Sequence, residues 1–141
     1  MTVVTIGYEG RQLDEFVAEL SNLRVEVVFD VRENAISRKP GFSKRRLGEA
    51  LGVAGIEYRH LSSLGNPCSN RVGFRAGEPA ARELFIRRLD DGSRDALDEV
   101  AAARSRSVAL MCFERDHASC HRSSIADRLV ADNPTLRVEP I

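Results

Sequence analysis

The chain has 141 residues, of which 43% are hydrophobic and 30% charged, and this composition predicts a single globular domain over residues 1–141. Its 21 basic and 21 acidic residues balance, so no overall charge draws the molecule to nucleic acid or to an anionic membrane. No apolar run approaches the roughly 20 residues that span a bilayer, and the first residues lack a signal-peptide pattern. Together with an odd count of three cysteines, these features predict a cytoplasmic protein with reduced thiols and no membrane contact.

The first half of the chain alternates predicted strands and helices. In chain order they are a strand at 2–8, a helix at 13–20, a strand at 25–32, a loop at 33–42, a helix capped by Ser43, a strand at 56–61 and a loop at 62–79. The two loops fit neither a strand nor a helix pattern. Loops of this length in compact domains often carry function.

The second half continues this alternation. It contains a helix starting at Pro79, a helix capped by Ser93, a strand at 108–114, a helix capped by Ser119 and a strand at 136–140. The best strand candidates are continuous apolar runs, as in parallel sheets covered on both faces. The order predicts an α/β fold with a mainly parallel sheet of about five strands, flanked by helices on both faces.

Several polar residues follow directly on the predicted strands. The first strand ends near Tyr8, the second ends in Asp30 and Arg32, and the fourth ends in Cys112 and Glu114. Ligands of open parallel sheets bind outside the carboxyl ends of the strands. We therefore expect these residues to converge on one rim. Ion pairing of Asp30 and Glu114 with arginines at the strand ends is the simpler structural alternative.

The sequence Cys120-His121-Arg122 lies just beyond Glu114. If Ser119 is the N-cap, these three residues form the first turn of the last helix, where free backbone N–H groups and the helix dipole favour an anion. An adjacent arginine suits phosphate or carboxylate, and the same environment favours a thiolate. Cys120 is then either a nucleophile or a residue lining the site. A small buried residue at a helix start is the structural alternative.

Other site types fit less well. A phosphatase loop needs a cysteine and an arginine separated by five residues, but this spacing from Cys112 or Cys120 leads to alanine. The spacing of Cys112, His117, Cys120 and His121 matches no familiar closed zinc site. The chain also lacks a glycine-rich dinucleotide motif and a phosphate-binding loop motif. The sequence therefore predicts no metal ion and no cofactor.

Residues 32–46 form one basic segment. It contains the cations Arg32, Arg38, Lys39, Lys44, Arg45 and Arg46, against the single acidic residue Glu33. Phe42 lies among them, and basic side chains near an aromatic ring are suited to hold a nucleotide or a nucleic-acid strand. The alternative is a hydrated loop whose cations remain in water.

Four ordered motifs resemble one known family. The sequences TIGYEGR, VFDVRENAISRKPGFSK, GIEYRHLSSLGNP and ALMCFERDHASCHRSSIA are similar to domain of unknown function 488, and they span nearly the whole chain. The resemblance implies an α/β domain whose activity is largely unassigned. Its recurrent polar positions would fall here on Tyr8, Asp30, Arg32, Ser37, Arg38, Phe42, Lys44, His60, Gly65, Cys112, Glu114, Cys120, His121 and Arg122.

Part of that family is linked to DNA base repair, as glycosylases that use a lysine for strand cleavage. This chain has only Lys39 and Lys44, and neither lies in or after the Cys-His-Arg sequence. A Schiff-base mechanism would need one of these two lysines. A glycosylase without lyase activity would instead activate water with Asp30 or Glu114.

These observations lead to a set of expected site residues. Catalytic roles are expected for Asp30, Glu114, Cys120 and His121. Ligand contacts are expected for Tyr8, Arg32, Ser37, Arg38, Phe42, Lys44 and Arg122. The predicted partner is a phosphate-bearing small molecule or a nucleic acid.

Three functions are consistent with these residues. The first is an enzyme, a hydrolase or DNA-glycosylase-like, acting on a nucleotide or a damaged base in DNA at the carboxyl edge of the sheet. The second is a module that binds nucleotide or nucleic acid without catalysis. The third is a thiol redox or metal-responsive protein that uses Cys112 and Cys120.

Overall fold

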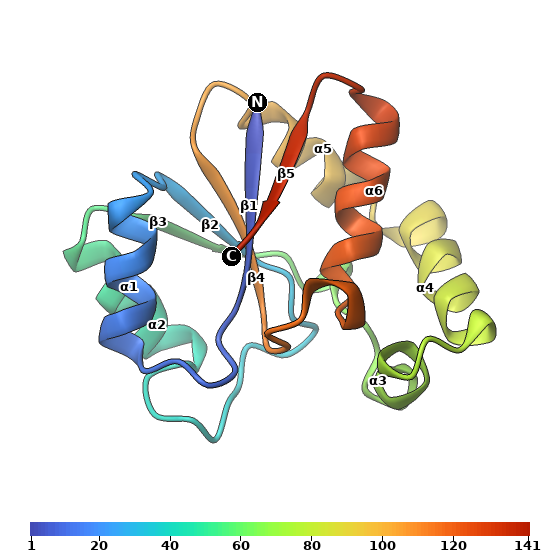
Figure 1. The fold of residues 1–141 in the computed structure, drawn as a ribbon, viewed down its shortest axis with the longest axis horizontal. Coiled ribbons are helices and arrows are strands. Elements are labelled where there is room, and N and C mark those ends of the chain that lie inside the picture. The colour runs from blue at the N-terminus through green and yellow to red at the C-terminus, as the bar shows by residue number, and fades with distance from the viewer.

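The computed structural model describes residues 1–141 and contains one five-stranded parallel sheet (Figure 1). The strands are β1 (Thr2–Gly7), β2 (Val27–Asp30), β3 (Glu57–His60), β4 (Val108–Cys112) and β5 (Arg137–Pro140). They are ordered β3-β2-β4-β1-β5 across the sheet, and every neighbouring pair is parallel. The predicted α/β class and parallel sheet are confirmed.

Helices cover both faces of this sheet. They are α1 (Leu13–Asn22), α2 (Lys44–Val53), α3 (Cys68–Arg75), α4 (Pro79–Gly92), α5 (Arg94–Ala102) and α6 (Arg122–Asp132), with short 3₁₀ turns η1 (Ser62–Leu64) and η2 (His117–Ser119). In Figure 1, α1 and α2 lie on one side of the strands, and α4, α5 and α6 lie on the other. Right-handed crossovers explain why the helices are divided between the two faces. The chain moves across the sheet from β1 through β2 to β3, and then moves back in the opposite direction through β4 to β5.

Two separate hydrophobic cores result from this layering. The core under α1 and α2 contains Phe16, Leu20, Leu47 and Leu51. The core on the opposite face contains Phe85, Leu97 and Ile125 from the other helices. All five residues of β4 are buried between the two cores, which explains the continuous apolar run of that strand. No helix combines the length and apolarity that a membrane span requires.

The segment at 62–79 differs from its predicted loop structure. It contains η1 and the helix α3, so three helices rather than two connect β3 to β4. Pro67 precedes the first turn of α3, and Phe74 is buried against Phe85 of the next helix. The sequence did not predict this helix, because the segment is rich in polar residues and glycines and α3 has only a small number of buried positions. The segment at 33–42 contains neither helix nor strand, as predicted.

The carboxyl ends of β1 and β4 come together as a topological switch point. The two strands are neighbours, with Gly7 level with Cys112. From there β1 leads to α1 on one face, whereas β4 leads to α6 on the other (Figure 1). Crevices of this kind are the usual ligand sites of open α/β sheets.

Gly7 permits the close approach of the chain at this point. A Cβ atom at position 7 would overlap the carbonyl oxygen of Glu114 and lie 2.9 Å from the backbone nitrogen of Arg115. Backbone atoms cannot move aside as a flexible side chain can. The glycine therefore fixes the path of the chain beyond β4 across the end of β1.

Replacing this glycine is expected to destabilise the protein. Gly7→Ala should lower the free energy of unfolding by about 2–3 kcal/mol, as overpacking does in rigid surroundings. Gly52→Ala is the matched control, because its added Cβ would meet nothing within 4 Å and α2 favours alanine. Urea denaturation of both variants measures the difference. Equal stability of the two variants would contradict the close approach.

Candidate functional site

The register of the strands divides the predicted rim into two groups of residues. Asp30 is level with Met111, whereas Gly7 is level with Cys112. Side chains alternate between the faces of a strand, so Asp30 and Cys112 point to opposite faces of the sheet. The residues share the carboxyl edge, as expected. The expected convergence on one rim is therefore divided between two faces, with Asp30 on one face and Cys112 on the other.

Asp30 and Arg32 form a buried ion pair on the α1–α2 face. Asp30 Oδ1 accepts hydrogen bonds from the backbone nitrogen and Nε of Arg32, at 3.1 and 2.9 Å. Oδ2 accepts from Arg32 Nη2 at 2.6 Å and from the Tyr58 hydroxyl at 2.5 Å. Burial and the charge of Asp30 raise the pKa of Tyr58, which keeps that hydroxyl a donor. The carboxylate is thus occupied by protein donors and enclosed by the core.

Tyr8 and Phe42 complete this group. Their rings stack at a centroid distance of 4.5 Å, and Phe42 also packs edge-on against Phe16. Arg32 Nη1 donates to the carbonyl oxygen of Phe42 at 2.7 Å, and its guanidinium lies over the ring of Tyr8. Both rings are buried. A ligand contact by Tyr8, Arg32 or Phe42 stays a prediction, since all three already have partners within the protein.

The rest of the basic segment lies at the surface. Arg38 and Lys44 are exposed, as are Arg45 and Arg46 beside them. Ser37 makes two hydrogen bonds within this segment. Its backbone nitrogen donates to Ser43 Oγ at 3.0 Å, and its own Oγ accepts from the backbone nitrogen of Lys39 at 3.1 Å. Of the residues predicted in this segment, Arg38 and Lys44 are the ones available to a molecule outside the protein.

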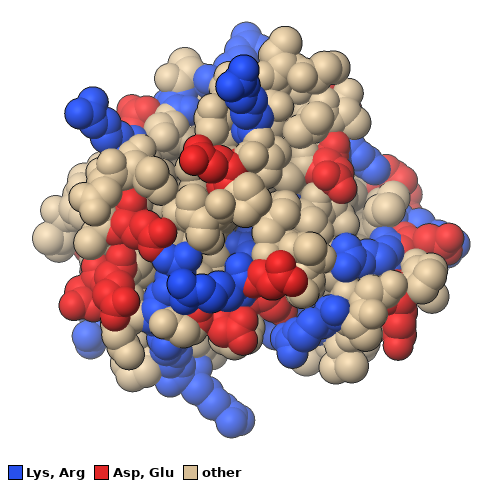
Figure 2. Space-filling view, in the orientation of Figure 1, with Lys and Arg blue, Asp and Glu red and all other residues tan.

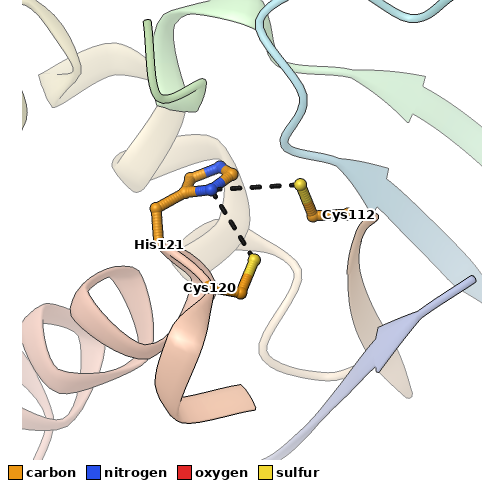
Figure 3. A group of neighbouring side chains, drawn as sticks. All are labelled: Cys112, Cys120 and His121. Atoms are coloured by element: carbon orange, nitrogen blue, oxygen red, sulfur yellow. Dashed lines mark hydrogen bonds between the residues drawn. The ribbon is translucent and has the colours of Figure 1, made fainter. Parts of the chain in front are cut away.

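Cys112, Cys120 and His121 come together on the opposite face (Figure 3). His121 Nδ1 lies 3.9 Å from Cys112 Sγ and 3.6 Å from Cys120 Sγ. Its Nε2 lies 2.7 Å from the carbonyl oxygen of Val31. All three residues are buried, and the Phe85 ring packs edge-on against the imidazole. The fold therefore brings together three residues that sequence spacing did not identify as a metal site.

The two thiols of this group have opposite pKa shifts. Burial by itself would raise the pKa of Cys120, but the hydrogen bond from Cys112 and the charges of His121 and Arg122 lower it well below its ordinary value. The hydrogen bond to Cys120, burial and nearby negative charge raise the pKa of Cys112. The hydrogen bond between the two thiols thus favours the proton on Cys112 over Cys120.

The start of the last helix differs from the prediction. Ser119 ends the turn η2, and α6 begins at Arg122 with His121 at the N-cap position. Asp116 caps the turn η2 by accepting from the backbone nitrogen of Ala118, whereas α6 has no side-chain cap. Cys120 and His121 thus precede the helix, and Arg122 is its first residue.

Arg122 is buried with an incomplete set of partners. Only 1% of its surface is exposed, and Nη2 donates to the carbonyl oxygen of Glu114 at 2.6 Å. Its Nε and Nη1 are buried without any hydrogen-bond partner. Native proteins satisfy nearly all buried polar groups, so an orphaned guanidinium requires an explanation.

Arg11 and Arg115 lie near Arg122 but were not among the residues predicted from the sequence. Arg11 is buried, donates from Nε to the carbonyl oxygen of Gly7 at 3.0 Å and pairs with Glu19. Burial lowers the pKa of Arg11, and the charges of Arg115 and Arg122 lower it further. A signal was present in the sequence, because both arginines follow closely on predicted strand ends.

Glu114 lies between the thiols and the surface. Its Oε1 accepts from Arg75 Nη2 at 3.1 Å, and its Oε2 lies 3.8 Å from Cys112 Sγ. The Glu114 side chain is 11% exposed and the partnering Arg75 side chain 52% exposed. Of the two predicted acids, Glu114 is therefore closer to solvent than the fully enclosed Asp30.

The buried pair on the α1–α2 face should contribute mainly to stability. Asp30→Asn is expected to lower the free energy of unfolding by about 3–5 kcal/mol, because it leaves Arg32 buried without a counter-charge. Glu49→Gln, which breaks the exposed Arg45–Glu49 pair, should cost less than about 1 kcal/mol. Urea denaturation compares the two variants. A small loss of equal size in both would show that Asp30 is not tied to Arg32.

Comparisons with known proteins place the chain in a family. The model of "Domain of unknown function DUF488" matches residues 12–129, more than four fifths of the chain. Two curated relatives, the UDP-N-acetylmuramoylalanine–D-glutamate ligases of Mycobacterium tuberculosis strains H37Ra and H37Rv, are 49% identical over 45 residues. That stretch covers 30% of this chain, and the chain spans only 9% of each ligase. No solved structure matches. The family match and the four motifs agree, and the chain belongs to the DUF488 family.

Proposed function

We propose that this protein binds a phosphate-bearing ligand between the carboxyl ends of β1 and β4, with Arg122 as the central contact. The observation that carries this proposal is the pair of unpartnered nitrogens, Nε and Nη1, on a buried guanidinium. A buried charge without a partner is strongly unfavourable. An anion supplies the missing acceptors, and the planar guanidinium fork matches two oxygens of phosphate.

The surroundings of Arg122 support an anionic ligand. Arg11 and Arg115 add two further cations at the same switch point, although the chain as a whole has no net charge. Burial lowers the pKa of His117, and the charge of the nearby Arg122 lowers it further. Figure 2 shows Lys and Arg side chains gathered at the lower centre of the face, below the strands, with acidic side chains around them.

The finer form of this proposal is a nucleotide or a nucleic acid. The exposed cations Arg38, Lys44, Arg45 and Arg46 follow β2 at the same edge of the sheet and can contact further phosphates. Phe42 is enclosed in the core, so recognition would rest on phosphate contacts rather than on stacking with that ring. The 45-residue similarity to the mycobacterial ligases covers too little of those enzymes to transfer their reaction.

If the bound ligand reacts, Glu114 is the residue best suited to act as acid or base. Its carbonyl oxygen contacts Arg122, and its carboxylate lies on the Cys112 face. Asp30 is suited to a structural role instead, since protein donors occupy its carboxylate on the other face. Catalysis by Cys120 or His121 requires a ligand to reach the buried thiol group.

Phosphate-dependent stability tests the proposal. Inorganic phosphate should raise the melting temperature of the wild-type chain relative to chloride at equal ionic strength. At a phosphate concentration of 100 times the Kd, the free energy of unfolding should increase by about 2.7 kcal/mol. Arg122→Met should abolish this effect, because it removes the charge and retains a long apolar side chain. Without phosphate, the variant should be at least as stable as the wild type, since an unpaired buried charge has been removed.

Arg104→Met is the matched control. Arg104 is exposed and precedes β4 at the opposite, amino edge of the sheet. This variant should respond to phosphate as the wild type does. An undiminished response in Arg122→Met, or no response in the wild type to phosphate, nucleotides and oligonucleotides, would refute the proposal.

A further inference from the structure

We infer that Cys112, Cys120 and His121 form a zinc-binding site. Two thiol sulfurs and one imidazole nitrogen lie within 4.8 Å of one another (Figure 3). Thiolate and imidazole are the donors that Zn²⁺ prefers in proteins. This site goes beyond the proposed phosphate contact, because its three ligands do not include Arg122 and it binds a cation rather than an anion.

The distances fit a tetrahedral ion. Zinc bonds of about 2.3 Å to sulfur and about 2.0 Å to nitrogen place these two ligand atoms about 3.5 Å apart in a tetrahedral site. The corresponding separations from His121 Nδ1 are 3.6 Å to Cys120 Sγ and 3.9 Å to Cys112 Sγ. The two nitrogen–sulfur separations therefore need to change by only a few tenths of an ångström, and the two sulfurs already lie within 4.8 Å of each other.

His121 is oriented as a metal ligand. The carbonyl oxygen of Val31 can only accept a hydrogen bond, so His121 Nε2 must carry the proton and donate across 2.7 Å. In the neutral ring the lone pair is then on Nδ1, the nitrogen that faces both sulfurs. Metal-binding histidines commonly use their second nitrogen in this way, which fixes both the tautomer and the ring orientation.

Glu114 adjoins Cys112 but lies outside the group of ligand atoms within 4.8 Å of one another, so its side chain must shift to supply a fourth ligand. Its Oε2 lies 3.8 Å from Cys112 Sγ, whereas Oε1 is engaged by Arg75. A carboxylate that holds an arginine with one oxygen can use the other for the ion. Two thiolates balance the charge of Zn²⁺, so the bound ion adds no net charge to the buried group once both thiols have released their protons.

The 141-residue chain is freed of metal with a chelator, kept reduced and titrated with Co²⁺, which serves as a spectroscopic substitute for Zn²⁺. About one equivalent should bind, with thiolate-to-cobalt charge-transfer absorption in the near ultraviolet and the ligand-field bands of a tetrahedral ion. Zn²⁺ should displace the cobalt and abolish both signals. In urea below the unfolding transition, zinc should also slow the alkylation of Cys112 and Cys120 beyond the protection that burial gives them in the metal-free chain.

Variants locate the ion. Cys112→Ser, Cys120→Ser and His121→Ala should each weaken Zn²⁺ binding more than about 100-fold, and Glu114→Gln about 10-fold with retained charge-transfer absorption. Cys68→Ser is the matched control, because Cys68 is exposed and lies outside the group, and it should bind as the wild type does. Should a ligand variant not fold, the wild-type cobalt spectrum and the alkylation pattern decide by themselves.

Two outcomes would overturn the zinc site. One is a wild-type spectrum of the reduced chain without charge-transfer absorption. Oxidation of the metal-free chain by air to a Cys112–Cys120 disulfide that a reductant reverses would then assign the pair to thiol redox chemistry. The other is equal loss of binding in Cys68→Ser, which would place the ion elsewhere. Neither outcome affects the phosphate response of Arg122, so the two proposals fail separately.

Discussion

The register of β4 between its neighbours β1 and β2 determines which candidate residues can meet. Cys112 is level with Gly7, and Met111 is level with Asp30. This offset of one residue sends the side chains of Asp30 and Cys112 to opposite faces. The absence of a side chain at Gly7 then lets the backbone after β4 cross the end of β1. This path brings the Glu114 carbonyl to Arg122 and leaves the arginines at the switch point.

The two faces of the carboxyl edge differ in how well their polar groups are satisfied. On the α1–α2 face, the Asp30 carboxylate has protein donors on both oxygens, so the group holds β2, β3 and the following loop together. On the other face, Arg122 lacks acceptors for two nitrogens, and His121 directs a nitrogen at two thiols. A satisfied buried network stabilises a fold, whereas the unsatisfied nitrogens of Arg122 are the groups at which we propose that a ligand binds.

The sequence predicted the fold class, which the structure confirms, and it predicted a site at the carboxyl edge of the sheet, which stays a prediction. Continuous apolar runs such as 108–112 indicate buried parallel strands, and polar residues after them lie at the carboxyl edge. The pairing register cannot be read from such runs, because the residues that point to either face of the sheet are all apolar. The division between Asp30 and Cys112 was therefore beyond prediction, as were the contacts of Arg11 and Arg115. The helix α3 was missed because its buried residues are few among polar ones.

The unpaired guanidinium is central to this account, and a crystal structure of the chain grown with phosphate tests it most directly. The account predicts electron density for an anion with oxygens about 3 Å from Arg122 Nε and Nη1. Density in which both nitrogens bond to protein groups or water, with no anion at the switch point, would contradict it.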